Sequence, residues 1–400
     1  MGSNTAQILL TADWRLHEVC EGILRVNPAS ADRLSHAPRD AVRRVVDFAI
    51  NEQVDILVNA GNTLAPNLAC PSDYNFLYGE LERLATANIS VVWNWSPLDE
   101  PQNWPRCFQF PSNVRRFTSR TPQVLKIPLK GGESVNFVGI ESAGSESVSN
   151  EWFDGIDLPG ITFGVSHSTP QGEGPEFNGW LVAGKGYSVV RDDKSLPLIK
   201  SGSPQSRSPK QIGPHGAVLV NACTNAETDI QFIDTSVLVY HNLQVAIQEH
   251  DRDALLEAIL DQLANRTYDD KILNAIGIEF LTELPSVRSI PLKMTAEALS
   301  ESIQSIFAEV SPSLFLTGIS IAGEANFGSA EHEEIIGEFL FAIKQLKESG
   351  WEQLHLRNYL PNGEYDKLAS LTEDLDGLNI INRSAALAVS LFERTDREVA

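Results

Sequence analysis

The sequence predicts an α/β protein in which two β-sheets pack as a sandwich flanked by helices, followed by a smaller C-terminal α+β cap domain. Three patterns predict this architecture. Strand-like runs alternate with amphipathic helical segments over residues 7–93, short strand-like runs without long helices follow over residues 135–240, and helical patterns return after Leu243. We therefore predict one domain over residues 1–245 and the cap domain over residues 246–400.

The first region has the order strand, helix, strand, helix, strand. The expected strands are Gln7–Ala12, Ile56–Ala60 and Ile89–Trp93, and the expected helices are Pro38–Gln53 and Asp73–Asn88. Both helical segments carry apolar residues at helical spacing, and Pro38 suits the start of a helix. This order predicts parallel strands joined by right-handed crossovers, and ligands of such sheets bind at the carboxyl ends of the strands.

The middle of the chain predicts a second sheet that packs on the first. Its expected strands are Val135–Ile140, Ile161–Ser166, Ala217–Val220, Ile230–Ile233 and Ser236–Tyr240. The segment Ser201–Pro209 is rich in Ser and Pro, which predicts an exposed loop. In the C-terminal part we expect helices at Arg252–Arg266, Ala296–Val310 and Glu331–Glu348, and strands at Leu314–Ile321 and Gln353–Asn358.

The composition is that of an ordinary globular protein. The chain of 400 residues is 42% hydrophobic, which suffices for one large and one smaller core. No apolar run approaches the roughly 18 residues of a membrane span, and residues 1–11 lack the pattern of a signal peptide, so we expect a cytoplasmic location without membrane contact. The cysteines form no CxxC pair, which argues against a structural zinc site and a disulfide framework. They are Cys20, Cys70, Cys107 and Cys223.

Charge is unevenly distributed along the chain, whose formal net charge is −22. Residues 101–130 contain six basic residues and no acidic one, namely Arg106, Arg115, Arg116, Arg120, Lys126 and Lys130. This segment predicts either a surface that binds phosphate groups or a solvated loop surface, and the sequence leaves both open. Trp93, Trp95 and Trp104 suit base stacking or core packing, with the core favoured for Trp93 because it ends a strand.

Five short blocks lie at or near the ends of expected strands. They are Asp13-Trp14-Arg15, Gly61-Asn62, Ser96-Pro97-Leu98-Asp99, His167 and Gly184-Lys185-Gly186-Tyr187. Their order and spacing resemble the DxH, GD, GNHD, H and GHxH blocks of calcineurin-like metallophosphoesterases. The flanking residues 41–60 and 201–220 are most similar to the SbcD nuclease subunits and their YhaO-like relatives. The resemblance covers residues 7–245 well and the remainder loosely.

The resemblance implies a metal site that has lost most of its ligands. In the family, Asp, His and Asn side chains hold two divalent cations, commonly manganese, one Asp bridges them, and the His of GNHD assists as an acid. Asp13 and His167 are retained as ligands. At the other positions the family pattern implies that the ligands have been replaced. Arg15 stands in place of a His, Asn62 in place of the bridging Asp, and Pro97 in place of the Asn. Leu98 stands in place of the assisting His, and Lys185 and Tyr187 stand in place of the two GHxH histidines.

These replacements remove the chemistry that metals need, since Arg and Lys offer no lone pair at neutral pH and Pro and Leu offer no side-chain ligand. We therefore expect no bound metal or other cofactor and no two-metal hydrolysis. Arg15 and Lys185 have two interpretations. They form an ion-paired plug with Asp13 and Asp99, or they bind a phosphate group without hydrolysing it.

The function predicted from this resemblance is that of a pseudoenzyme, a catalytically inactive SbcD-like subunit in DNA repair or processing that binds DNA or an SbcC-like ATPase. The expected phosphate and DNA contacts are Arg115, Arg116, Arg120, Lys185 and Arg207. One alternative is an active phosphoesterase or DNA exonuclease with a relocated or single-metal site on Asp13, His17, Asp99 and His167. Another is a phosphate-sensing module. Whether the chain forms a homodimer stays open.

Overall fold

The computed structural model describes residues 5–22, 28–141, 148–172, 174–175, 177–184, 186–190, 197–223, 228–246, 252–281 and 296–322. The chain divides into two compact units. One comprises Met1–Asn242, Tyr268–Gly277 and Phe307–Gly318, and the other comprises Leu243–Thr267, Ile278–Ile306 and Ile319–Ala400. The predicted helix at Glu331–Glu348 and strand at Gln353–Asn358 lie outside the described residues.

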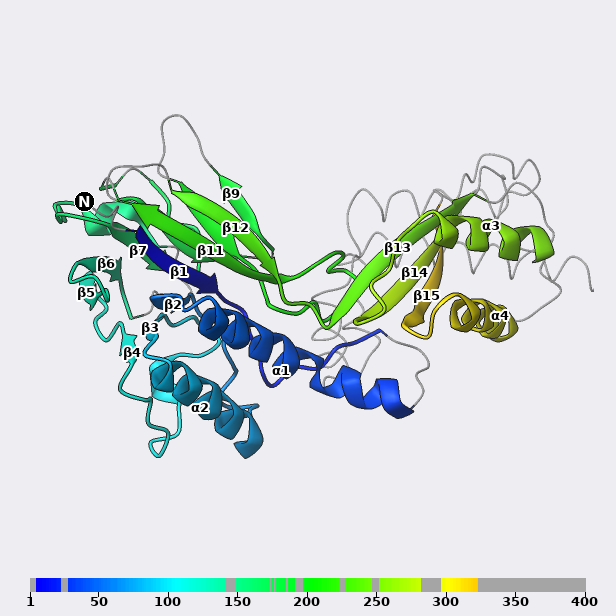
Figure 1. The fold of residues 1–400 in the computed structure, drawn as a ribbon, viewed down its shortest axis with the longest axis horizontal. Helices are drawn as coiled ribbons and strands as arrows, with labels where there is room; N and C mark the ends of the chain where they lie inside the picture. The colour runs from blue at the N-terminus through cyan, green and yellow to red at the C-terminus, as the bar shows by residue number, and fades with distance from the viewer. Residues whose placement is uncertain are drawn as a thin grey trace, which may run out of the picture. The chain divides into compact units, whose positions relative to one another are not determined.

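The first sheet has six strands in the order β12-β11-β1-β2-β3-β4 (Figure 1). Its strands are β1 (Thr5–Thr11), β2 (Ile56–Asn59), β3 (Ser90–Trp93), β4 (Val114–Arg116), β11 (Gly216–Cys223) and β12 (Asp229–Asp234). Strands β1, β2 and β3 are parallel, as the sequence predicts, and β4 is a fourth parallel strand that it did not predict. The helices α1 (Pro28–Asn51) and α2 (Pro71–Thr86) form the first two crossovers. Strand β11 pairs antiparallel with β1 and β12.

The second sheet also has six strands, in the order β5-β6-β7-β8-β10-β9. Its strands are β5 (Gln123–Pro128), β6 (Ser134–Gly139), β7 (Thr162–Ser166), β8 (Gly179–Ala183), β9 (Ser188–Val190) and β10 (Leu198–Ser201). Two short 3₁₀ helices are η1 (Pro101–Asn103) and η2 (Asn150–Phe153). The predicted strands at Ala217–Val220, Ile230–Ile233 and Ser236–Tyr240 do not belong to this sheet. The first two lie in the first sheet, where β11 pairs with β1 and β12, and the strand that begins at Leu238 belongs to a third sheet.

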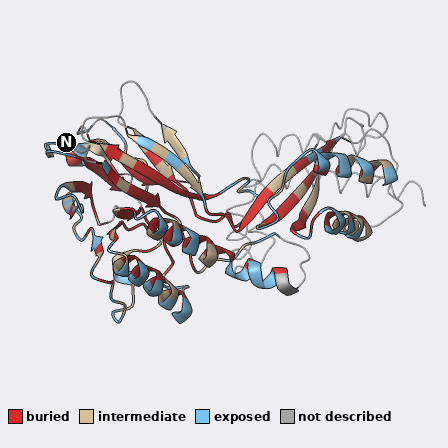
Figure 2. Cartoon of the chain, viewed as in Figure 1, coloured by how far each residue is buried: buried red, intermediate tan, exposed pale blue. Residues whose placement is uncertain are grey.

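The core lies between the two sheets and under the helices (Figure 2). On β1, Ile8 and Leu10 pack with residues of the second sheet, whereas Leu9 packs with residues of α1 and α2. This alternation follows from the two-residue period of a strand, whose successive side chains point to opposite faces. The predicted sandwich of two sheets flanked by helices is therefore confirmed for the described residues.

Helix α1 begins at Pro28, ten residues before the predicted start, so the prediction of a helix start at Pro38 is wrong. Pro38 lies inside the helix, where a missing N–H and ring crowding normally break helical structure. Packing outweighs that cost because the added turns bury Leu34 against Tyr240 and Phe315. Tertiary contacts of this kind are invisible to a local pattern.

A third sheet of three strands has the order β13-β14-β15, with β13 (Leu238–Ala246), β14 (Leu273–Leu281) and β15 (Leu314–Ala322). Helices α3 (Arg252–Ala264) and α4 (Ala296–Val310) confirm the predicted helices there, and β15 confirms the predicted strand at Leu314–Ile321. None of the helices in the described ranges is long and apolar enough to span a membrane.

Candidate functional site

Two loops meet at the carboxyl ends of β1 and β2. The backbone N–H of Asp13 donates to the carbonyl of Gly61 (2.9 Å), and that of Arg15 donates to the carbonyl of Asn62 (3.1 Å). Asp13, Arg15 and Asn62 all adopt left-handed backbone conformations, with φ of 58°, 40° and 58°. Such conformations are uncommon for residues other than glycine and gather at functional sites.

Gly61 lies where the loop after β2 approaches Ser96 and His167 closely. Its φ of 110° is accessible to glycine rather than to side-chain-bearing residues. A Cβ atom at Gly61 would lie 3.2 Å from Cβ of Ser96 and 3.4 Å from Cβ of His167. The blocks predicted from sequence at residues 13–15, 61–62 and 96–99 of the first sheet therefore converge with His167, which follows β7 of the second sheet.

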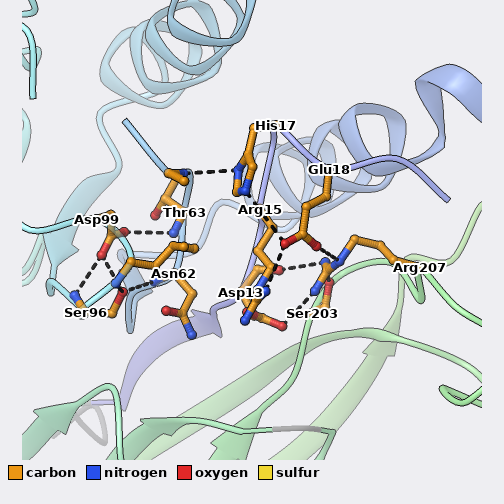
Figure 3. A network of polar contacts seen from close by, with 12 residues as sticks. Asp13, Arg15, His17, Glu18, Asn62, Thr63, Ser96, Asp99, Ser203 and Arg207 are labelled. Atoms are coloured by element: carbon orange, nitrogen blue, oxygen red, sulfur yellow. Dashed lines mark hydrogen bonds and ion pairs between the residues drawn. The ribbon is translucent and has the colours of Figure 1, made fainter. Parts of the chain in front are cut away.

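The Asp13 carboxylate is bound by two guanidinium groups (Figure 3). Nε of Arg15 donates to Oδ1 (2.7 Å), and Nη2 of Arg207 donates to Oδ2 (2.9 Å). Nη1 of Arg207 also donates to the Asp13 carbonyl oxygen (3.1 Å). The predicted ion pair between Arg15 and Asp13 is thus present, and Arg207 is its unpredicted second partner.

Glu18 completes a closed set of four charges. Its Oε1 accepts from Nη1 of Arg15 (2.9 Å), and its Oε2 lies 2.8 Å from Nε of Arg207. We name Asp13, Arg15, Glu18 and Arg207 the plug. Burial acts to lower the pKa of Arg15, but Asp13 and Glu18 outweigh it and raise that pKa, so the guanidinium stays charged. Two carboxylates and two guanidiniums cancel, as partly buried charges require.

Asp99 is held differently from the carboxylates of the plug. Its Oδ2 accepts from the backbone N–H of Thr63 (2.8 Å), and its Oδ1 accepts from the N–H (2.7 Å) and Oγ (2.6 Å) of Ser96. No cation pairs with Asp99 in the described part of the chain. Arg15 pairs with Asp13 and Glu18, and Lys185, the other predicted partner, lies outside the described residues. Burial raises the pKa of Asp99, although these three donors act in the opposite direction. Asp99 joins the loop after β2 to the loop after β3.

Two histidines adjoin these loops. Nδ1 of His17 accepts a hydrogen bond from the N–H of Ala65 (3.1 Å), and its Nε2 lies 3.7 Å from Oε1 of Glu18. Among the described residues, no hydrogen bond or ion pair engages the His167 ring. Burial lowers the pKa of both rings and favours their neutral forms.

The side chains at this edge do not fit a pair of metal ions. Both oxygens of Asp13 bind guanidinium groups, the bridging position holds the neutral amide of Asn62, Pro97 is exposed, and Leu98 is half-buried. No cluster of three or more His, Cys, Asp or Glu side chains suited to a metal occurs in the part of the chain that the structure describes. Divalent cations need oxygen or imidazole ligands, and the carboxylates of the plug already lie against two fixed positive charges that repel a further cation.

The last two predicted site residues come from the block at positions 184–187. Lys185 lies outside the described residues. Tyr187 is 43% exposed, and its ring packs on that of Phe232, with a centroid distance of 5.2 Å. Its contacts identify Tyr187 as a packing residue between β9 and β12.

The segment Ser201–Arg207 is buried, so the prediction of an exposed loop is wrong there. Oε1 of Gln205 accepts from the N–H of Val237 (2.8 Å), and Nε2 donates to the carbonyl of Leu238 (2.7 Å). Nη1 of Arg207 donates to Oγ of Ser203 (2.6 Å). The side chain of Arg207 is only 7% exposed, which places it inside the plug and not on a phosphate-binding surface.

The basic residues from Arg115 onward lie on or beside two edge strands, β4 and β5. Arg115 and Arg116 are exposed on β4, and Arg120 is exposed before β5. The guanidinium of Arg116 lies 4.7 Å from the ring centroid of Phe110. No acidic residue pairs with any basic residue of positions 101–130 in the described ranges.

The tryptophans near this segment form a cluster of their own. The Trp93 and Trp95 ring centroids are 6.0 Å apart, and those of Trp95 and Trp104 are 5.7 Å apart. Trp93 and Trp95 are buried, and Nε1 of Trp104 donates to the Asp99 carbonyl. Core packing, the favoured interpretation for Trp93, therefore extends to Trp95.

Sequence reasoning did not identify Glu18 as part of the site. The sequence did show that Glu18 lies three positions after Arg15, and at this spacing the two side chains form an ion pair in the structure. No local signal could have joined Arg207 to Asp13, because 194 residues separate them.

Comparisons with known proteins give a distant relationship. No family model matches the chain. It is 22% identical over 323 residues to the uncharacterized metallophosphoesterase YhaO of Bacillus subtilis (strain 168), covering 74% of this chain and 77% of that protein. The chain is a distant relative of a metallophosphoesterase. This similarity agrees with the resemblance to metallophosphoesterases that the sequence motifs predict.

Among solved structures, the chain is similar to a dimetal phosphatase from Danio rerio. The TM-score is 0.35 and the identity 9%, and the match covers 57% of this chain and 98% of that one.

Proposed function

We propose that this metallophosphoesterase homologue is catalytically inactive and acts as a DNA-binding subunit. The observation that carries the inactive part is the Asp13 carboxylate, whose two oxygens accept hydrogen bonds from Arg15 and Arg207 at 2.7 and 2.9 Å. A metal ion at Asp13 would have to compete with both guanidinium groups for the same carboxylate. It would also meet their positive charge, which cannot be titrated away at any ordinary pH.

The alternative, an active enzyme with a single metal on Asp13, His17, Asp99 and His167, has less support. Nδ1 of His17 accepts from Ala65, and the Asp99 oxygens accept from Thr63 and Ser96. A metal would have to break each of these internal bonds before the four side chains could converge on it. Breaking them leaves buried donors unsatisfied, which costs about 1–3 kcal/mol for each donor.

The DNA-binding part rests on the basic residues of positions 101–130. Arg115, Arg116 and Arg120 are exposed. The guanidinium groups of the plug, by contrast, form ion pairs with carboxylates. Exposed arginines without acidic partners release counterions when they contact a nucleic-acid backbone, which makes such binding favourable and salt-dependent. Binding of an SbcC-like ATPase through residues 246–400 belongs to the same proposal and rests on the resemblance.

The decisive experiment compares the chain with a variant in which the family ligands are restored. That variant carries Arg15→His, Asn62→Asp, Pro97→Asn, Leu98→His, Lys185→His and Tyr187→His. Both proteins are assayed with manganese against bis(p-nitrophenyl) phosphate and linear DNA, and their metal content is measured. We expect no hydrolysis and no stoichiometric manganese in the unaltered chain. Manganese-dependent hydrolysis by the unaltered chain, abolished by Asp13→Ala, would refute the proposal.

A further inference from the structure

Three arginines in the described ranges lie over aromatic rings, and Arg116 differs from the other two. Cζ of Arg39 and Cζ of Arg43 lie 5.8 and 5.1 Å from the ring centroid of Phe76, and carboxylates pair with both arginines. Cζ of Arg116 lies 4.7 Å from the ring centroid of Phe110. Arg116 is exposed, and its side chain forms no hydrogen bond or ion pair with any described residue. The ring alone therefore holds this guanidinium, and its N–H donors remain available to a ligand.

The ring beneath Arg116 is fixed in place. Phe110 contacts four other aromatic rings at centroid distances between 5.0 and 5.8 Å, namely those of Trp93, Trp95, Trp104 and Phe108. The backbone of Arg116 is fixed as well, because it pairs with Trp93 where β4 runs parallel to β3. The guanidinium is therefore positioned before any ligand arrives, which lowers the entropic cost of binding.

The surroundings of Arg116 are positively charged. Arg115 precedes it on β4, and Arg106 and Arg120 are exposed on either side of it in the sequence. Residues 101–130 contain no acidic residue. We name Arg115, Arg116 and Arg120 the basic edge. A surface of this kind attracts phosphate groups by charge alone, and that attraction requires no ring beneath any of its arginines.

A guanidinium held over a ring offers a flat, positively charged surface on which a nucleobase can stack. Bases of single-stranded nucleic acids stack on aromatic rings and on arginine guanidinium planes, whereas in a duplex the neighbouring base pairs cover the faces of the bases. We propose that Arg116 over Phe110 is a stacking site for a base of single-stranded DNA, and that Arg115 and Arg120 contact the adjoining phosphates. This inference rests on the proposed DNA binding by the basic edge, and it names the form of DNA that the edge prefers.

The test measures the affinity of the full chain for three labelled oligonucleotides of equal length at one salt concentration. They are a thymidine strand, an abasic strand that has the same phosphates but no bases, and a duplex. Because a stacked base adds to the attraction of the phosphates, the unaltered chain should bind the thymidine strand at least about fivefold more tightly than the abasic strand. In Arg116→Lys this preference should be lost, since an ammonium group keeps the charge but has no plane, while duplex affinity stays within about twofold.

Two further variants separate stacking from charge. Phe110→Leu keeps every charge of the basic edge and should also lose the preference for the thymidine strand. Arg115→Lys is the matched control, because Arg115 is exposed on the same strand and no aromatic ring of the described residues lies under it. This control should keep the preference.

Equal affinity of the unaltered chain for the thymidine and abasic strands would overturn the proposal, and so would an undiminished preference in Arg116→Lys. An equal loss of preference in Arg115→Lys would overturn it too, because the effect would then not depend on the ring. Should Phe110→Leu fail to fold, the two lysine variants decide. DNA binding that ignores the bases overturns this inference alone, whereas failure to bind any of the three oligonucleotides overturns the proposed DNA binding itself.

Discussion

The plug and the basic edge use the same residue type in opposite ways. Arg15 and Arg207 each contact Asp13 and Glu18 at distances between 2.7 and 2.9 Å. Arg115 and Arg116 on β4 are exposed and have no acidic partner among the described residues. The difference shows that the place of an arginine in the fold, and not its residue type, decides what its guanidinium group binds. Internal guanidiniums compensate carboxylates and support the fold, whereas external ones remain free to bind a polyanion.

The largest expected effect is that of Arg207→Ala. This change leaves Asp13 and Glu18 with Arg15 alone and removes a side chain that is 7% exposed. We expect the free energy of unfolding to fall by about 3–5 kcal/mol, as for other broken buried pairs. Chemical denaturation measures it, with Arg207→Lys as a control that keeps the charge but not the fork of N–H donors. A loss below about 1 kcal/mol would mean that the plug does not stabilise the fold.

The second effect concerns DNA affinity and tests the other side of the comparison. The combined variant Arg115→Glu, Arg116→Glu and Arg120→Glu should bind linear DNA more than tenfold more weakly. Its salt dependence should be shallower by up to about 2.7 in the log–log slope, or about 0.9 for each lost phosphate contact. The matching change to Gln should have a smaller effect on affinity. Unchanged affinity in the Glu variant would show that the basic edge does not bind DNA.

Local patterns predicted the parts of this molecule that depend on nearby residues. Strands β1, β2 and β3 and helix α2 follow from apolar runs and helical spacing. The convergence of residues 13–15 and 61–62 follows from parallel pairing of β1 with β2, which brings their carboxyl ends to one edge. The ion pair between Arg15 and Asp13 was predicted from the family resemblance, which places Arg15 at the position of a metal ligand beside Asp13.

Features that depend on distant pairing were not predictable in this way. Strand β11 joins the first sheet because Ile8 pairs with Val220, and nothing near either residue specifies that partner. The burial of Gln205 depends likewise on β13, whose backbone it binds. Ser and Pro content predicts an exposed loop, but side-chain hydrogen bonds to the backbone of Val237 and Leu238 make burial favourable.

Arg15→Ala should have a smaller effect than Arg207→Ala. Arg15 is 35% exposed, so solvent already screens part of its interaction, and Arg207 still binds Asp13 and Glu18 in its absence. We expect a loss of about 1–2 kcal/mol in the free energy of unfolding. Parallel denaturation of the two alanine variants gives the order directly. A larger loss for Arg15→Ala would identify Arg15, and not Arg207, as the main support of Asp13.

The smallest effects are expected at Arg115 and Arg116, and they separate two explanations of the basic edge. Charged residues on edge strands prevent sheets from pairing edge to edge, so β4 would carry arginines even without a nucleic acid to bind. The guanidinium of Arg116 lies 4.7 Å from the Phe110 ring centroid, an interaction worth about 0.5–1 kcal/mol at an exposed site. Arg116→Ala should therefore cost about that much stability, and Arg115→Ala less than about 0.5 kcal/mol.

If edge protection were the sole role, both variants would aggregate more readily while DNA affinity stayed constant. If the edge binds DNA, each variant should lose affinity and flatten the salt dependence by about 0.9, whatever its effect on stability.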